Sequence, residues 1–344
     1  MAHIVDSIKD SKLLYDGATQ NEGAIIVLRS KLSAIAKRLG IADLKRENML
    51  LVAAELVSNN VKHAGGRGLV QVWQQPGPVL DIFSLDYGPG IRDLSRAEED
   101  GFSSMGTLGK GLGSIRRLSD ESYIYTQPGG QTRKWNGTAF LARFHLGKNP
   151  ENIGFFSRSL SDVRHNGDRI YLYETPGRVR WLHLDGLGHG AEAQAATADL
   201  ASCLAHFDDL ESAMASADSQ LVAKRGAVAI FGEIDLEKQK LKLLGVGDMH
   251  AHLYMDEQMR HISFAPGILG RDHRSPSQFQ TEVARKSVIV TASDGVRRNW
   301  DTSNFAGLFN QHPQLIAYIL GNIMGRLSDD QSIFVSTIKK ENAT

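Results

Sequence analysis

The stretch AAELVSNNVKHAGG, residues 53–66, sets the interpretation of the first half of the chain. It closes a segment, 43–63, in which apolar residues recur three and four positions apart, a period that predicts an α-helix. Glu55, Asn59 and His63 are four residues apart, so they lie on one face of that helix. Taken alone, this polar face is either a solvated stripe or part of a binding site, and the neighbouring sequence decides between the two.

The sequence on either side of this helix predicts an α+β domain with a long glycine-rich loop. A second helix is expected at 24–39, and the glycines at 65, 66 and 68 stop the helix over 43–63. Strands are expected at 69–74, 79–85, 122–126 and 138–144, and a short helix at 114–118. The glycine-rich stretch 86–113 separates these strands, and a loop of that length usually has a function. We therefore expect an active-site lid over residues 95–113.

Two glycine-containing motifs in this half suit a nucleotide. DYGPG, residues 86–90, follows a predicted strand, and Asp86 could accept a hydrogen bond from an adenine amino group where Gly88 and Gly90 allow close approach of the backbone. GTLGKGLGSIRRL, residues 106–118, places four glycines before a helix, whose first N–H groups favour a phosphate. The spacing is not that of a P-loop, because no Gly-Lys-Ser/Thr follows.

The ordered set E-x-x-x-N-x-x-x-H, D-x-G-x-G, G-x-G-x-G and a late Gly-Thr pair at 137–138 resembles the GHKL ATPases. Over residues 20–145 the chain looks like the RsbT-type serine/threonine switch kinases. The resemblance implies a Bergerat-type ATP-binding α/β sandwich over residues 1–146, in which Asn59 holds Mg²⁺, Glu55 orients or deprotonates the attacking hydroxyl, and Asp86 recognises adenine. Lys110 either touches a phosphate or is solvated. The other residues expected at the nucleotide are His63, Gly88, Gly90, Gly109, Gly111, Gly113 and Thr138.

The second half predicts another α+β layered domain. The polar stretch LGKNPENIG, residues 146–154, predicts a linker. Helices are expected at 191–206 and 210–224. Strands are expected at 168–174, 178–184, 227–234, 240–246, 250–254, 287–292 and 332–338.

Carboxylates recur at the ends of these predicted strands. Asp185-Gly186 and Asp294-Gly295 follow strands, and Asp329-Asp330 precedes one. A single aspartate at such a place is commonly a turn former, but three of them beside apolar strands suggest a shared site. Clustered carboxylates need cations to offset their repulsion, and oxygen-rich sites suit Mg²⁺ or Mn²⁺. Two such ions can generate a hydroxide and stabilise in-line attack on a phosphoester.

The matches NGDRIYLYE, LDGLGHGAEA, GVGDM, APGILG, TASDGV and DDQSIFV resemble PP2C-like phosphatases of the SpoIIE and RsbX kind over residues 155–340. The resemblance implies an α-β-β-α sandwich with two Mn²⁺ or Mg²⁺ ions. Asp185 should bridge them, the Gly186 carbonyl should bind one, and Asp294 and Asp329 should complete the set. Asp168 matches a further acidic position, and His189 is expected beside the site rather than on a metal. The family pattern places no phosphate-binding arginine.

Composition limits the other classes of function. The chain has 39 basic and 39 acidic side chains, and this balance favours neither nucleic acid nor a membrane surface as partner. No apolar run approaches the roughly 20 residues that span a bilayer, and the start of the sequence does not have the pattern of a signal peptide. We expect Cys203, the single cysteine, to be a buried structural thiol. We therefore expect a cytoplasmic protein.

Two motif sets in one chain predict a bifunctional bacterial regulator. It would phosphorylate and dephosphorylate Ser or Thr on STAS-type antagonist or stressosome scaffold proteins in a partner-switching pathway. A sigma factor or another activator of the phosphatase is a further partner that the resemblance admits. The alternative is an ATP-regulated phosphatase whose N-terminal domain only binds nucleotide or an anti-sigma-type partner. A purely binding module is a third hypothesis, and the intact carboxylates weigh against it.

Overall fold

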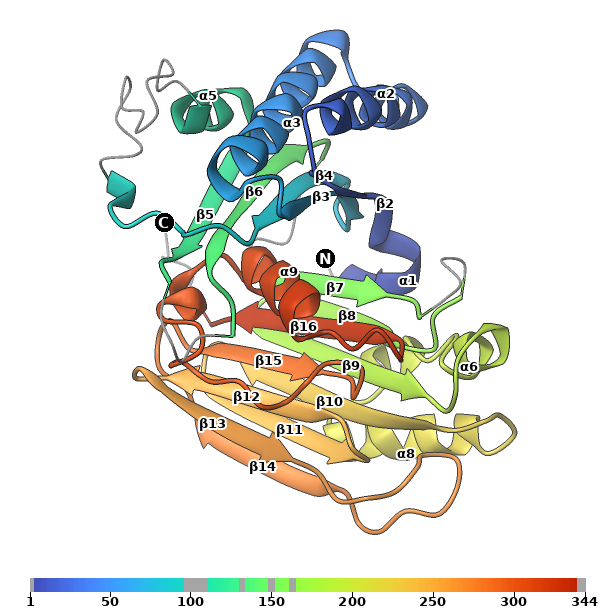
Figure 1. Cartoon of the computed structure of the whole chain (residues 1–344). Helices are drawn as coiled ribbons and strands as arrows, with labels where there is room; N and C mark the ends of the chain where they lie inside the picture. Colours follow the sequence, from blue (N-terminus) through green and yellow to red (C-terminus); the bar gives the residue numbers. More distant parts are fainter. Residues whose placement is uncertain (1–2, 96–110, 130–133, 148–151, 161–164, 339–344) are drawn as a thin grey trace. The chain divides into compact units, whose positions relative to one another are not determined.

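The computed structural model describes residues 3–95, 111–129, 134–147, 152–160 and 165–338 (Figure 1). The chain forms two compact units, each assembled from separate stretches of sequence. Unit N contains Lys12–Pro150 and Ser303–Gln311, and unit C contains Met1–Ser11, Glu151–Thr302 and His312–Thr344. The sequence predicted two continuous domains, 1–146 and 155–340, whereas these units exchange short segments.

Unit N is an antiparallel sheet covered by helices on one face (Figure 1). The strand order is β2-β3-β4-β6-β5. Leu32 of α2, Val52 and Leu56 of α3, and Ile115 of α5 pack with strand residues such as Ile82 into one buried cluster. The strands are β2 Lys12–Ala18, β3 Gly68–Gln75, β4 Val79–Asp86, β5 Glu121–Gln127 and β6 Gly137–His145, and the helices are α2 Gly23–Arg38, α3 Asp43–Ala64 and α5 Gly111–Leu118.

Local sequence explains the limits of the central helix in unit N. Helix α3 ends at Ala64 because Gly65, with φ of 61°, takes the left-handed conformation that glycine adopts easily. The helix therefore matches the predicted range 43–63 to within one residue. The chain then turns into β3, which pairs with β4 along its whole length.

The segment Ser303–Gln311, which includes the short 3-10 helix η1 Leu308–Asn310, belongs to unit N although it lies far along the sequence. Gln127 Nε2 donates a hydrogen bond to the carbonyl oxygen of Asn304 at 2.8 Å, and the Tyr125 hydroxyl donates one to that of Ala306 at 3.1 Å. The end of β5 thus holds this segment by its backbone.

Unit C is an α-β-β-α sandwich. Its six-stranded sheet has the order β1-β8-β9-β10-β11-β14, and its five-stranded sheet has the order β13-β12-β15-β16-β7. The first sheet contains β1 His3–Asp6, β8 Arg169–Thr175, β9 Arg178–Gly186, β10 Ala227–Asp235, β11 Lys240–Val246 and β14 Ser277–Glu282. The second contains β7 Ile153–Arg158, β12 His250–Met255, β13 Gln258–Ser263, β15 Val288–Ala292 and β16 Gln331–Thr337.

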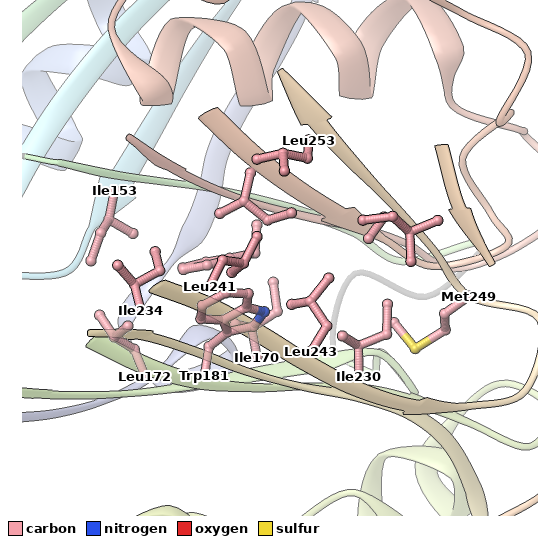
Figure 2. Close-up of a cluster of buried hydrophobic side chains, with 14 of the residues drawn as sticks. Ile153, Ile170, Leu172, Trp181, Ile230, Ile234, Leu241, Leu243, Met249 and Leu253 are labelled. Carbon is pink, nitrogen blue, oxygen red and sulfur yellow. The ribbon is translucent and has the colours of Figure 1, made fainter. Parts of the chain in front are cut away.

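Apolar side chains fill the space between the two sheets of unit C. Figure 2 shows Leu172 and Trp181 of the six-stranded sheet in the same buried cluster as Leu253 of the five-stranded sheet. Helix α8 packs against the outer face of the first sheet, and helix α9 packs against β7 and β16 of the second. The helices of this unit are α1 Ser7–Asp10, α6 Ala191–Ala196, α7 Ser202–Ala205, α8 Leu210–Leu221 and α9 Pro313–Met324.

The structure of unit C differs from the sequence predictions at several places, since β13, β14 and α9 match no expected element. The helix expected over 191–206 is interrupted between α6 and α7, where Asp199 has a left-handed φ of 64° that an α-helix cannot contain. The linker expected over 146–154 extends into β7, whose Ile153 is buried and pairs with β16. Strand β1 was not expected, and it pairs with β8 through buried Val5. In the described part of the chain, no helix is both long and apolar enough to cross a membrane.

Candidate nucleotide and metal sites

The polar face of α3 lies against the start of α5. Glu55 and Asn59 are half-buried on this face, whereas His63, one turn later, is exposed. A β-carbon added to Gly111, the first residue of α5, would lie 2.3 Å from Glu55 Oε1 and 3.6 Å from Asn59 Nδ2. The structure thus brings Glu55, Asn59 and Gly111 together, and a side chain at position 111 would displace the Glu55 carboxylate.

The carboxylate of Asp86 at the end of β4 is buried and held by backbone groups. Its Oδ1 accepts hydrogen bonds from the N–H groups of Gly88 at 2.7 Å and Thr138 at 3.2 Å. Burial raises the pKa of Asp86, while those two hydrogen bonds and the charges of His63 and Arg67 oppose the increase. Its Oδ2 has no hydrogen-bond partner among the described residues, so it can accept a hydrogen bond from a ligand.

Three glycines allow the backbone to close around Asp86. Gly137 has a φ of 147°, and a β-carbon there would lie 2.1 Å from the Asp86 carbonyl oxygen. Gly90 has a φ of 72°, and a β-carbon there would lie 2.6 Å from the Gln127 carbonyl oxygen. A β-carbon on Gly88 would lie 2.9 Å from Asp86 Oδ1 and 3.0 Å from the β-carbon of Ala64. Gly137 and Gly90 need glycine because a side chain would collide with backbone, and Gly88 leaves room for the Asp86 carboxylate.

Parts of the expected nucleotide site fall outside the described residues. These are Gly109, Lys110 and most of the lid expected over residues 95–113. Gly113 lies in α5 and is half-buried. Sequence reasoning assigned no role to Asn60, which is buried and accepts a hydrogen bond from the Ser84 hydroxyl at 3.1 Å. The sequence signal that could have identified Asn60 as buried was its position on the apolar face of α3, in line with Ala53 and Leu56.

Unit C gathers the predicted carboxylates at one end of its sheets. Asp185 lies in β9 and Asp168 just before the adjacent β8, whereas Asp294 follows β15 and Asp329 precedes the adjacent β16. Burial raises the pKa of Asp185 well above its ordinary value, and the negative charges of Asp168, Asp294, Asp329 and Asp248 raise it further. This mutual repulsion shows that the four predicted carboxylates lie close together.

A hydrogen-bonded chain orients Asp168. The Ser332 hydroxyl donates to Asp168 Oδ2 at 2.7 Å, and the His183 ring contacts Ser332 Oγ at 2.7 Å and Thr291 Oγ1 at 2.9 Å. Burial raises the pKa of Asp168 to about 7, although hydrogen bonds from Ser293 and Ser332 oppose the increase. Burial also lowers the pKa of His183 to about 3, so its ring is neutral at pH 7.

The donor set fits hard divalent cations. Buried Asp168 and half-buried Asp185, Asp294 and Asp329 repel one another, and a cation is the usual means of offsetting such repulsion. Within the described ranges, no three carboxyl, imidazole or thiol groups already converge on a point where they could hold one ion by themselves. This arrangement suits Mg²⁺ or Mn²⁺ ions that complete their coordination with water and phosphate oxygens.

The remaining predicted positions of this region are also visible. Gly186 ends β9, and a β-carbon there would lie 2.8 Å from the Ala193 carbonyl oxygen, so this turn also needs glycine. His189 is exposed in the loop between β9 and α6. The sequence reasoning missed two acidic residues beside the cluster, Asp248 and Asp330. Asp330 fixes the loop before Asp168, because its Oδ2 accepts a hydrogen bond from the Gly167 N–H at 2.7 Å.

Comparison with known proteins agrees with this geometry. Residues 19–133 match the histidine kinase-like ATPase domain family, and residues 175–339 match the stage II sporulation protein E (SpoIIE) family. The serine/threonine-protein kinase RsbT of Bacillus subtilis (strain 168) is 35% identical over 120 residues, which are 33% of this chain and 90% of that protein. The chain joins an RsbT-family ATPase domain to a SpoIIE-type PP2C domain. The family and fold class expected from the sequence are therefore confirmed.

Two solved structures resemble this chain at low sequence identity. A structure from work on the bacterial stressosome as a modular system has a TM-score of 0.50 and 21% identity, and the match covers 54% of this chain and 98% of that one. The PP2C phosphatase domain of SpoIIE from Bacillus subtilis, with a fragment of its regulatory domain, has a TM-score of 0.48 and 14% identity, with 94% and 95% covered.

Proposed function

We propose that this chain both phosphorylates and dephosphorylates Ser or Thr side chains on STAS-type antagonist or stressosome proteins, as a partner-switching regulator. The observation that carries the proposal is that one chain contains both sets of predicted site residues. These are Glu55 beside Asn59 in the ATPase domain and the carboxylate cluster around Asp185 in the PP2C domain. The identity with a serine/threonine-protein kinase supports the kinase half. The match to the SpoIIE family supports the phosphatase half.

In the kinase half, each chain group has one task. Asp86 Oδ2 would accept a hydrogen bond from the adenine amino group, because Oδ1 is already occupied by backbone N–H groups. Asn59 would hold Mg²⁺ through its side-chain oxygen, and the N–H groups at the start of α5 would face the phosphates. Glu55, half-buried beside them, would orient the substrate hydroxyl and take its proton.

In the phosphatase half, Asp185, Asp294, Asp329, Asp168 and the Gly186 carbonyl would hold two Mn²⁺ or Mg²⁺ ions. When bound, such ions supply a hydroxide nucleophile and offset the charge of the phosphoryl group. Ser332 would keep Asp168 in its binding orientation through the 2.7 Å hydrogen bond.

Metal-dependent hydrolysis of p-nitrophenyl phosphate tests the phosphatase half. We expect activity with Mn²⁺, none in EDTA, and a loss of at least about ten-fold in Mn²⁺ affinity for Asp294→Asn because a ligand charge is removed. Asp256→Asn, at an exposed turn, is a matched control that should behave as wild type. Activity that persists fully in EDTA would contradict the metal mechanism.

Calorimetry with a non-hydrolysable ATP analogue tests the nucleotide site. Asp86→Asn removes a charge-assisted hydrogen bond and should weaken binding by roughly one to two decades. Unchanged affinity would exclude this role for Asp86. A chain that binds ATP and hydrolyses phosphate esters but transfers no phosphate to a STAS-domain protein would instead be the nucleotide-regulated phosphatase of the alternative hypothesis.

A further inference from the structure

A pocket opens beside the carboxylate cluster of the PP2C domain. Two short segments line it, one of Arg297, Arg298 and Asn299 and the other of Arg326, Leu327 and Ser328, and its volume is about 690 Å³. All six residues are exposed. The first segment begins three residues after Asp294, and the second ends one residue before Asp329. Each segment that lines the pocket is therefore close in sequence to a predicted metal ligand.

Backbone hydrogen bonds tie the two segments to each other. The Arg326 N–H donates to the Gly295 carbonyl oxygen at 2.7 Å, and the Arg297 N–H donates to that of Met324 at 2.8 Å. Val296 and Gly325 also form a β-bridge. Because these bonds involve backbone atoms, the Arg326 side chain is not needed to hold the loops together and remains available to a ligand.

The three guanidinium groups carry positive charge without carboxylate partners. Arg298 donates to the Asp248 carbonyl oxygen, and Arg297 Nη1 makes a long contact of 3.4 Å with the Gly325 carbonyl oxygen. Arg326 makes no side-chain hydrogen bond, and none of the three forms an ion pair, with any described residue. The charges of Arg326 and Arg298 oppose the increase in the pKa of Asp294, which indicates that both lie near the cluster.

We propose that Arg298 and Arg326, with Arg297 at the rim, bind the phosphoryl group and adjoining chain of a phosphorylated protein segment. This inference rests on the proposed phosphatase function. It assigns the phosphate-binding arginines that the family pattern did not place. A planar guanidinium can donate two parallel hydrogen bonds to phosphate oxygens, so arginines from two segments that line one pocket suit a phosphoryl group. The volume exceeds that of a phosphoryl group alone, and exposed Leu327 offers apolar contact for the flanking chain.

Steady-state hydrolysis of a phosphoserine peptide and of p-nitrophenyl phosphate, both at saturating Mn²⁺, tests this proposal. Arg326→Gln and Arg298→Gln should each raise KM for both substrates about ten-fold, with kcat close to wild type, because a charge-assisted hydrogen bond is lost. Inhibition by inorganic phosphate should weaken by the same factor. Arg326→Lys, which keeps the charge, should recover part of the affinity.

Two controls separate phosphate binding from damage to the site. Arg285→Gln removes the same charge at an exposed position away from the pocket and should leave KM unchanged. Calorimetry of Mn²⁺ binding should give an affinity no weaker than wild type for Arg326→Gln, because the substitution removes a positive charge near the carboxylates and no hydrogen bond to a described residue.

Three outcomes would overturn the inference. Unchanged KM values in both glutamine variants, with active enzyme, would show that the pocket does not bind the phosphoryl group. A fall in kcat with altered Mn²⁺ affinity and constant KM would show that the arginines shape the metal site instead. Wild-type protein that hydrolyses neither substrate would refute the phosphatase proposal itself, and this inference with it.

Discussion

Replacing Gly111 with alanine should disable phosphoryl transfer while the fold survives. The new β-carbon would lie 2.3 Å from Glu55 Oε1, whereas ordinary contact begins at 3.4 Å, so the carboxylate must retreat by about 1 Å. A misplacement of about 1 Å in a reacting group can lower a rate by roughly 100-fold. Gly111 starts α5 without a positive φ, so alanine is compatible with the helix.

Two measurements separate this effect from a general loss of function. Transfer from labelled ATP to a STAS-domain protein of the same organism should fall by about 100-fold, while calorimetry with an ATP analogue should give nearly unchanged affinity. Gly129→Ala is the matched control, since a β-carbon there meets nothing within 4 Å. Transfer at the full rate by Gly111→Ala, or an equal loss in Gly129→Ala, would refute the assigned position of Glu55.

Two further predictions concern stability. Deleting residues 1–11 removes β1 from the edge of β8 and also removes Asp6, the ion-pair partner of buried Arg169. The free energy of unfolding of unit C should therefore fall by roughly 3–5 kcal/mol. An unchanged midpoint of thermal unfolding in a chain that starts at residue 12 would contradict this. Burial, with the charges of His250 and His261 nearby, lowers the pKa of His252 to about 2. Below about pH 6.5 the unfolded chain therefore binds a proton at this residue that the folded chain does not bind, and the contribution of His252 to the free energy of unfolding should fall by about 2 kcal/mol between pH 6.5 and 5. Denaturant unfolding of His252→Phe should show a shallower decline over that window, and an identical pH profile would count against it.

The parts of the fold that follow from local sequence were predictable. The limits of α3 follow from its helical period and from Gly65, and its polar face follows from the spacing of Glu55 and Asn59. The carboxylates of the PP2C domain were found because each lies at the end of an apolar strand. The structure then adds what spacing could not give, namely that Gly111 faces Glu55 directly.

Features that depend on distant pairing were not predictable. Val5 pairs with Leu172, more than 160 positions further along the chain. The segment Ser303–Gln311 lies between two stretches of unit C in the sequence but packs in unit N. No local sequence pattern specifies such distant partners. Helix α9 was missed for a different reason. It is buried on nearly all sides, so its sequence lacks the polar face that reveals an amphipathic helix. The arginines of the pocket were missed because their loops have no periodic signal.

The proposed function requires that one chain adds and removes the same phosphate. Intact mass of a STAS-domain partner, followed in ATP with Mg²⁺ and Mn²⁺, tests this with the wild-type chain and with Asp185→Asn and Glu55→Gln. Phosphorylated partner should accumulate with Asp185→Asn. None should form with Glu55→Gln, which should still clear partner supplied in phosphorylated form. A partner that stays unmodified with Asp185→Asn, or that is phosphorylated at one residue and cleared only at another, would contradict it.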